Sequence, residues 1–363
     1  MSDTSKYRQI FDDLQKAIRD GRYGKNKALP SEEAIIRKYG VSRTTAVKAM
    51  AELVRSGLVY RRRGKGTFVS RTASLESGRL GLIMPSLSYG EVFPQICHAL
   101  ARRTQQDGFT MLLGDISARD PRSRAREARD VARMFVREHV AGVVMQPLAF
   151  LRTPERVTLE ILEMLANADI PVVLIDRDID MGPEPVRHDF VGIDNIAAGR
   201  ALGAHVLACG AKRIRFLMRP RCASVIRDRL DGVVSALGDV CASDCAIVAE
   251  PDDVAALRPV FASRGRPDAV ICESDYVTAI LRNTLDRFGL SVPRQVMLAG
   301  FDDVRCAMTT SPPLTTIRQP CSEIADVAYL TLLDRIRDSR LPPRRILLPA
   351  PLVVRESTRR MSK

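Results

Sequence analysis

The fold of the amino-terminal part is decided by residues 29–69, LPSEEAIIRKYGVSRTTAVKAMAELVRSGLVYRRRGKGTFV. Ser31 is a favourable N-cap for a helix that continues to Tyr39 and ends at Gly40. A second helix is expected after Ser42, another N-cap residue, because the apolar side chains that follow it recur at the spacing of one helix face. The sequence therefore predicts two short helices joined by a tight turn.

A basic β-hairpin is expected directly after the second helix. Residues 58–60 and 67–69 form two short apolar runs, and they flank Arg-Arg-Arg-Gly-Lys-Gly at 61–66. The glycines of this turn permit positive φ angles. A further amphipathic helix is predicted upstream, over residues 5–20. Three helices followed by a hairpin make a winged helix-turn-helix domain, an architecture that binds DNA.

Positive charge is concentrated in this predicted domain. Residues 1–71 contain 17 Lys and Arg against 7 Asp and Glu, a net charge of +10, whereas the whole chain of 363 residues carries +13. A basic head on a nearly neutral body is typical of a domain that neutralises phosphates. We therefore expect double-stranded DNA as a partner.

The start of the second of these helices and the hairpin turn supply the candidate DNA contacts. Arg43 is the best candidate for reading a base, because a guanidinium can donate two hydrogen bonds to guanine. Thr44 and Thr45 are expected to meet phosphate or a thymine methyl group. The predicted DNA-binding set is Ser31, Ser42, Arg43, Thr44, Thr45, Lys48, Arg61, Arg62, Arg63, Gly64, Lys65 and Gly66.

Three motifs in this region resemble the head of the GntR family. They are L-P-S-E at 29–32, V-S-R-x-T at 41–45 and G-L-x-x-x-x-x-G-x-G-T-F-V at 57–69. The resemblance implies that DNA is contacted by Ser42, Arg43, Thr45, Gly64 and Gly66. The chain departs from the family pattern at Val47, where an arginine is usual, and we expect the neighbouring Lys48 to replace that contact.

Residues 71–79 are polar and without periodicity, which predicts a linker between head and body. From residue 80 onward, short apolar runs alternate with amphipathic segments of helical length, which predicts an α/β body with parallel sheets. About 280 residues suit two such sheets better than one. The expected strands are 80–84, 110–113, 142–145, 172–175, 190–193, 214–217, 246–248, 269–272 and 296–299.

The body resembles the effector-binding core of the lactose-repressor family, which is similar to periplasmic sugar-binding proteins. The motifs that carry this resemblance are V-G-I-D-N at 191–195, G-F-D-D at 300–303, P-L-T-T-I-R-Q-P at 313–320 and P-L-V-V-R-E-S-T at 351–358. With the GntR-like head, the chain is similar to regulators of the arabinose-repressor type.

The resemblance implies two Rossmann-like lobes over residues 80–359, joined by three crossings of the chain. The first lobe is expected to take about 80–189 and 321–345, and the second about 190–318 and 346–359. An effector is expected in the cleft between the lobes, because parallel sheets place ligands at the carboxyl ends of their strands.

Three residues match positions that hold sugar hydroxyls in that family, namely Asp176, Arg229 and Asp302. Each of them has an alternative role as a structural ion-pair partner. Ser274 takes a position where relatives often have asparagine, and Ser86 and Phe93 are candidates for the wall of the first lobe. The residues leave sugar, sugar acid, polyol and nucleobase open as effectors.

Other features exclude several classes of protein. The amino terminus lacks the apolar core of a signal peptide and no window reaches 18 consecutive apolar residues, so we expect a cytoplasmic protein without a membrane partner. The eight cysteines are scattered, which predicts neither a disulfide framework nor a metal site. We predict no catalytic residue and no cofactor.

The sequence leaves two alternatives to a DNA-binding regulator. A solute-binding protein is opposed by the basic head and the missing export signal. An enzyme that carries pyridoxal phosphate needs a Schiff-base lysine, and the only lysine between Gly66 and Ser362 is Lys212, in a surface-like turn. The sequence therefore favours a transcriptional repressor that binds a pseudopalindromic operator as a homodimer and responds to a sugar-like effector.

Overall fold

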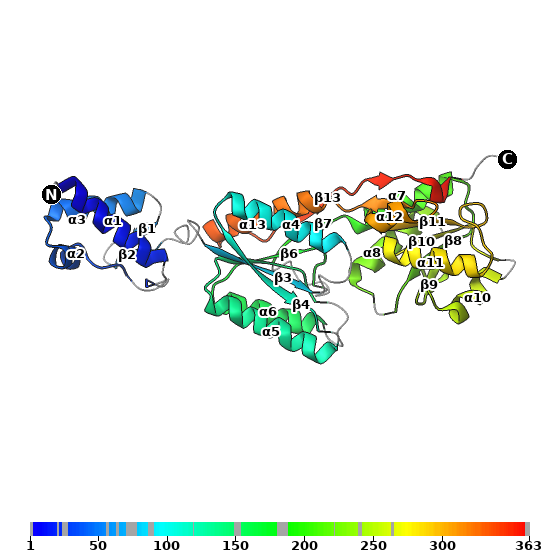
Figure 1. Cartoon of the computed structure of the whole chain (residues 1–363), viewed down its shortest axis with the longest axis horizontal. Helices are drawn as coiled ribbons and strands as arrows, with labels where there is room; N and C mark the ends of the chain where they lie inside the picture. Colours follow the sequence, from blue (N-terminus) through cyan, green and yellow to red (C-terminus); the bar gives the residue numbers. More distant parts are fainter. Residues whose placement is uncertain are drawn as a thin grey trace.

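The computed structural model describes the residues of a small head and a larger two-lobed body (Figure 1). The described ranges are 3–19, 22–23, 28–55, 58–62, 65–69, 78–85, 91–118, 120–148, 154–179, 188–220, 222–238, 242–262 and 265–359. Most of the predicted linker, and the predicted contacts Arg63, Gly64 and Ser86, lie outside these ranges.

The head contains three helices and a two-stranded antiparallel hairpin, as the sequence predicts. Its elements are α1 (Asp3–Arg19), α2 (Glu32–Tyr39), α3 (Arg43–Arg55), β1 (Val59–Arg62) and β2 (Gly66–Val69). The Ser31 side chain caps α2 by accepting from the amide of Ala34 at 3.2 Å, and Gly40 ends the helix with a φ of 59°. The helices bury one core, to which α3 contributes Ala46, Ala49, Met50 and Leu53.

The first lobe is a six-stranded, all-parallel sheet in the order β13-β7-β6-β5-β3-β4. Its strands are β3 (Arg79–Pro85), β4 (Thr110–Ile116), β5 (Gly142–Met145), β6 (Val172–Ile175), β7 (Asp189–Ile193) and β13 (Arg345–Leu348). Figure 1 shows helices on both faces, which explains why the central strands β5 and β6 are apolar and buried at every residue. One face carries α4 (Val92–Gln106) and α13 (Cys321–Arg337), and the other α5 (Pro121–Arg137) and α6 (Pro154–Asn167).

The second lobe repeats this plan with the order β14-β12-β11-β10-β8-β9, in which only the edge strand β14 is antiparallel. Its strands are β8 (Ile214–Met218), β9 (Ala246–Val248), β10 (Ala269–Cys272), β11 (Met297–Asp302), β12 (Thr315–Arg318) and β14 (Leu352–Val353). Its helical segments are α7 (Asn195–Ala208), α8 (Ser224–Leu237), α9 (Ala242–Cys245), α10 (Val254–Ala262), α11 (Asp275–Arg287), α12 (Arg305–Thr309) and the 3₁₀ turn η2 (Glu356–Thr358). The helices α7 and α8 pack on one face of the sheet, and α10 and α11 on the other.

The chain crosses between the lobes three times, but two crossings fall later than expected. The predicted boundaries placed 190–193 and 346–348 in the second lobe, whereas β7 and β13 pair with each other in the first sheet. These boundaries were wrong because an apolar run followed by a helix cap reads equally well as the last strand of one lobe or the first of the next. The deciding contact is the pairing of two segments about 155 residues apart, Ile346 opposite Val191.

Candidate functional site

The amino-terminal end of α3 presents a small group of exposed polar side chains. Ser42, Arg43 and Thr44 are all exposed. The Ser42 hydroxyl accepts from the amide of Thr45 at 3.2 Å, so this residue caps the helix as predicted. The Thr45 side chain, by contrast, is only 3% exposed, and its hydroxyl lies 2.7 Å from that of Ser42. Thr45 therefore positions Ser42, and its side chain is not presented to solvent as the predicted DNA contact requires.

The hairpin adds further cations beside this helix. Arg62 and Lys65 are exposed, and Gly66 has a φ of 113°, which explains the need for glycine in the turn. Arg61 forms an ion pair of 2.8 Å with Glu32 at the start of α2, which fixes the hairpin against the helical part. The Lys48 ammonium lies 4.5 Å from the centre of the Tyr7 ring, so this candidate contact is held over α1.

A second group of polar residues gathers where the two lobes meet. We call Asp176, Arg177, Arg229, Glu273 and Asp302 the inter-lobe cluster. Asp176 and Arg177 follow β6 of the first lobe, whereas the other three come from α8 and from the ends of β10 and β11 in the second. The charges of Asp176, Arg229 and Glu273 act on the pKa of Asp302, and the charge of Arg229 acts on the pKa of Arg177. The structure therefore brings together the three predicted residues Asp176, Arg229 and Asp302.

Glycines determine where Arg229 lies. A Cβ atom at Gly199 on α7 would approach the Arg229 carbonyl oxygen to 2.1 Å, and one at Gly232 on α8 would approach the Ile196 oxygen to 2.1 Å. Only glycine permits so close an approach of two helix backbones. As a consequence, the Arg229 side chain reaches across to Asn195, the first residue of α7.

Arg229 is 4% exposed, and its guanidinium is held from several sides. Its Nε donates to Asn195 Oδ1 at 2.9 Å, and its Nη1 donates to the Glu273 carbonyl oxygen at 2.7 Å. The same Nη1 lies 3.6 Å from Asp302 Oδ1, and the guanidinium stacks over the Phe301 ring at 4.6 Å. An arginine fixed in this way presents its remaining donors in a defined direction.

Burial is the main influence on the pKa of two carboxylates of the second lobe, Asp302 and Asp275. It raises the pKa of Asp302, a shift that Arg229 and Gln319 oppose. Burial also raises the pKa of Asp275 well above its ordinary value, and the nearby Asp302 adds to that shift. Asp275 accepts from the amide of Val304 at 3.3 Å through Oδ2, while Oδ1 has no partner in the described part of the chain. Asp275 therefore lies under the cluster as a carboxyl group that resists ionisation.

The first lobe contributes Asp176 together with a residue that the sequence did not suggest. The amide nitrogen of Gln146, directly after β5, donates to Asp176 Oδ2 at 2.8 Å, and Arg177 Nε lies 3.3 Å from the same oxygen. Asp176 and Asp302 have positive φ angles of 68° and 113°. Non-glycine residues rarely adopt such angles, and strain of this kind is concentrated at functional sites.

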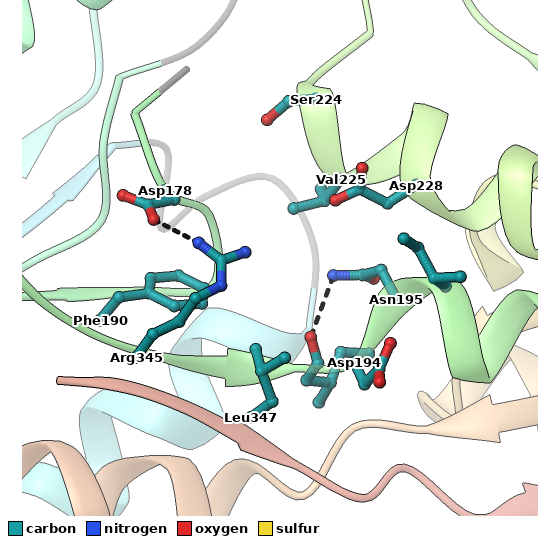
Figure 2. Close-up of a pocket in the computed structure, with 11 residues that line it drawn as sticks. Asp178, Phe190, Asp194, Asn195, Ser224, Val225, Asp228, Arg345 and Leu347 are labelled. Carbon is teal, nitrogen blue, oxygen red and sulfur yellow. Dashed lines mark hydrogen bonds and ion pairs between the residues drawn. The ribbon is translucent and has the colours of Figure 1, made fainter. Parts of the chain in front are cut away.

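A small pocket lies between the lobes next to the cluster (Figure 2). Its volume is about 100 Å³, and it is lined by Asp178, Phe190, Ile193, Asp194, Asn195, Ile196, Ser224, Val225, Asp228, Arg345 and Leu347. The close-up shows Asp178 facing Arg345, with Val225 and Asp228 across from them. Asn195 belongs to this lining and accepts the Arg229 hydrogen bond, so one side chain links the pocket to the inter-lobe cluster.

The remaining predicted effector residues have other surroundings. Ser274 caps α11 by accepting from the amide of Val277 at 3.3 Å, so its hydroxyl has a structural partner. Phe93, in the first turn of α4, is half-buried and packs against the core of the body. Gln146, Asn195 and Glu273 are site residues that the sequence did not predict. Gln146 and Glu273 directly follow strands, and that position could have identified them.

Neither a membrane helix nor a metal cluster is found in the part of the chain that the structure describes. No helix there is long and apolar enough to cross a membrane. Within the same residues, no three His, Cys, Asp or Glu side chains are grouped so that they could hold a metal ion.

Comparisons with known proteins match both parts of the chain. Residues 6–69 match the model of the bacterial regulatory proteins of the gntR family, and residues 204–358 match a periplasmic binding protein-like domain. The first range contains the helices and hairpin of the head, and the second contains most of the second lobe together with α13 and β13 of the first.

Named relatives extend the likeness over the whole chain. An arabinose metabolism transcriptional repressor from Geobacillus stearothermophilus is 26% identical over 98% of both chains. The ribose operon repressor of Bacillus subtilis is 25% identical over 78% of this chain and 82% of its own. The solved complex of the transcriptional regulator CelR with cellobiose, 23% identical, superposes with a TM-score of 0.66 over 91% of this chain and all of that one. The protein thus joins a GntR-type helix-turn-helix domain to a periplasmic-binding-protein-like domain, and it is similar to repressors of the LacI and GntR types.

Proposed function

We propose that this protein is a cytoplasmic transcriptional repressor whose affinity for its operator is controlled by a sugar-like molecule bound between the lobes. The observation that carries the proposal is the presence, in one chain, of an exposed cationic helix end and a polar cluster shared by two lobes. The function is binding and not catalysis. The names of the relatives, which include repressors of arabinose metabolism and of the ribose operon, support it.

The DNA contact follows from the geometry of the head. The exposed end of α3 enters the major groove with Arg43 toward a base edge, and the hairpin lies against the backbone with Arg62 and Lys65. A homodimer places two such heads on the two halves of a pseudopalindromic operator. Sedimentation of the full-length protein at micromolar concentration tests the dimer.

The response to effector requires that the effector stabilises one arrangement of the lobes more than another. Residues of both lobes take part in the cluster, so a ligand that contacts Asp176 and Asp302 at once favours closure. A 10- to 100-fold change in operator affinity corresponds to about 1.4–2.7 kcal/mol of coupling. A single new pair of charge-assisted hydrogen bonds is enough to supply this.

The proposed function is tested by fluorescence anisotropy with labelled DNA from the region upstream of the gene, at several salt concentrations and with a panel of sugars. We expect binding that weakens steeply with salt and that changes at least 10-fold with an effector. Failure to bind any fragment at low salt, or a complex insensitive to salt, contradicts the proposal.

Removal of residues 1–71 is the matching control. The head has a hydrophobic core of its own, separate from the clusters that stabilise the body. We therefore expect the truncated protein to remain folded, to bind effector with unchanged affinity and to lose DNA binding. If removal of the head also abolishes effector binding, the head and the body are not independent modules.

A further inference from the structure

Arg177 is a buried cation with an unused hydrogen-bond donor. Its side chain is 12% exposed, and its Nη1 is buried with no hydrogen-bond partner among the described residues. Among the described residues, the acceptor that its guanidinium contacts is Asp176 Oδ2, which Nε approaches at 3.3 Å. That oxygen also accepts the shorter 2.8 Å hydrogen bond from Gln146. One carboxylate oxygen thus accepts from two donors, and its distance to Arg177 is the longer of the two.

The charges around Arg177 do not compensate this arrangement. Burial lowers the pKa of Arg177, Asp176 opposes the shift, and the nearby cations Arg124 and Arg229 lower the pKa further. Across the cluster, burial raises the pKa of Asp302, and the charge of Arg229 opposes that shift. A buried charged donor without a partner is unfavourable by about 1–3 kcal/mol or more. A ligand that binds at such a site is expected to supply the missing hydrogen-bond acceptor.

An unused acceptor lies beside the unused donor. Gln146 is fully buried, and its Oε1 has no hydrogen-bond partner in the described part of the chain. An amide oxygen and the carboxylate of Asp176 are suitable acceptors for ligand hydroxyl groups. A guanidinium group is suited instead to a carboxylate or a phosphate, which it binds through two parallel hydrogen bonds. The unused donor of Arg177 and the acceptors of Gln146 and Asp176 therefore match a molecule that has both hydroxyl groups and a negative charge.

We propose that the effector is an anionic polyhydroxylated compound, a sugar acid or a sugar phosphate, and that Arg177 binds its negative group. The proposal rests on the function proposed above and adds the chemical class of the ligand. Arg177 then determines specificity, since Gln146 and Asp176 bind the hydroxyl groups that charged and neutral sugars share. A sugar acid and a sugar phosphate offer the same chemistry to the guanidinium, and the experiment separates them.

The test is calorimetric titration of the full-length protein with three sets of compounds. The neutral set is glucose, ribose and arabinose, the carboxylate set is gluconate, glucuronate and galacturonate, and the phosphate set is glucose 6-phosphate and ribose 5-phosphate. Inorganic phosphate and acetate serve as anions without hydroxyl groups. We expect the tightest binding in one of the two anionic sets, and which set binds decides between carboxylate and phosphate. A neutral sugar as the tightest ligand, or no binding by either anionic set, overturns the proposal.

The Arg177→Gln variant then tests the residue. We expect the affinity for the anionic ligand to fall by about 30- to 1000-fold, as for removal of one partner of a buried charge pair. The affinity for the corresponding neutral sugar should change by less than about threefold. Arg340→Gln makes the same charge change at a side chain that is 89% exposed, and it should leave every affinity unchanged.

The outcomes separate this inference from the function on which it rests. If Arg177→Gln weakens the binding of charged and neutral sugars equally, the residue has only a structural role and the proposal is wrong. A neutral sugar that changes operator affinity contradicts the anionic ligand but leaves the repressor function standing. An anion that binds through Arg177 without any effect on DNA binding contradicts the repressor function and leaves the ligand assignment standing.

Discussion

The head and the inter-lobe cluster both depend on arginine, but they expose it differently. Arg43 and Arg62 lie in solvent, free to adapt to a phosphate or a base edge. Arg229 is buried and held by Asn195 and the Glu273 carbonyl oxygen. An exposed charge attracts DNA over a distance and is screened by salt. A buried, fixed guanidinium contributes little at long range but distinguishes ligands by the position of their oxygen atoms.

This contrast explains how one chain can meet two very different ligands. In the head, the net charge matters more than the geometry, so several cations share the contact with DNA. In the cluster, each buried charge needs a partner, so a single substitution leaves others unpaired.

The substitution Arg229→Ala should have the largest effect. It removes the donor to Asn195 and to the Glu273 carbonyl and leaves Asp302 without its facing cation. Breaking a buried pair in this way should lower the free energy of unfolding by about 3 kcal/mol, measured by urea denaturation. Arg227→Ala, an exposed position on the same helix, should change it by less than about 0.5 kcal/mol. Equal effects of the two variants would contradict the role given to burial.

The substitution Arg43→Ala should weaken operator binding by about 10- to 100-fold and relax the preference for one base pair. The stability of the protein should stay the same, because the side chain is exposed. Anisotropy titrations against the operator and its single-base variants measure both quantities. Arg55→Ala, at the far end of α3 with a side chain that is 78% exposed, is the control. A loss of affinity without any change in base preference would make Arg43 a phosphate contact.

The substitution Asp275→Asn should change how stability depends on pH. The folded-state pKa of Asp275 lies above the unfolded one, so the folded protein holds a proton that the unfolded chain has released. Wild-type stability should therefore fall as pH rises above about 4, by at most about 1.4 kcal/mol per pH unit, until the folded-state pKa is passed. The Asn variant should lack this part of the decline in urea midpoints between pH 4.5 and 8. A variant curve parallel to the wild type would contradict the raised pKa of Asp275. Asp286→Asn, at a side chain that is 57% exposed, is the matched control for the same substitution.

The substitution Lys65→Ala should have the smallest effect. We expect the slope of the logarithm of the DNA association constant against the logarithm of the salt concentration to become shallower by about 1. The affinity for every DNA sequence should fall by a similar factor. Lys212→Ala, an exposed lysine of the second lobe, leaves the slope unchanged if only the head binds DNA. A steeper loss for the operator than for unrelated DNA would instead assign Lys65 to base recognition.

Local sequence patterns were sufficient for most of the helices and strands. The caps at Ser31 and Ser42 and the inward face of α3 are confirmed, because they depend on residues within one helical turn of each other. Asp176 directly follows β6 and Asp302 is the last residue of β11, and such positions meet at one edge of a parallel sheet, so both could be expected in one cluster. Gln146 takes the same kind of position after β5, and attention to every polar residue at a strand end would have included it.

The order of helices and strands, the basic head and an α/β body long enough for two sheets follow from periodicity, caps, charge and length along the chain. The two lobes were expected from the resemblance. The strand pairing that assigns β7 and β13 to the first lobe, and the approach of α7 to α8 that joins Arg229 to Asn195, are set only when the chain is folded. The tertiary structure also decided that Thr45 is buried and that Arg177 has a buried donor without a partner among the described residues. The physical reason is that burial and hydrogen-bond partners depend on segments far apart in sequence, which local patterns do not bring together.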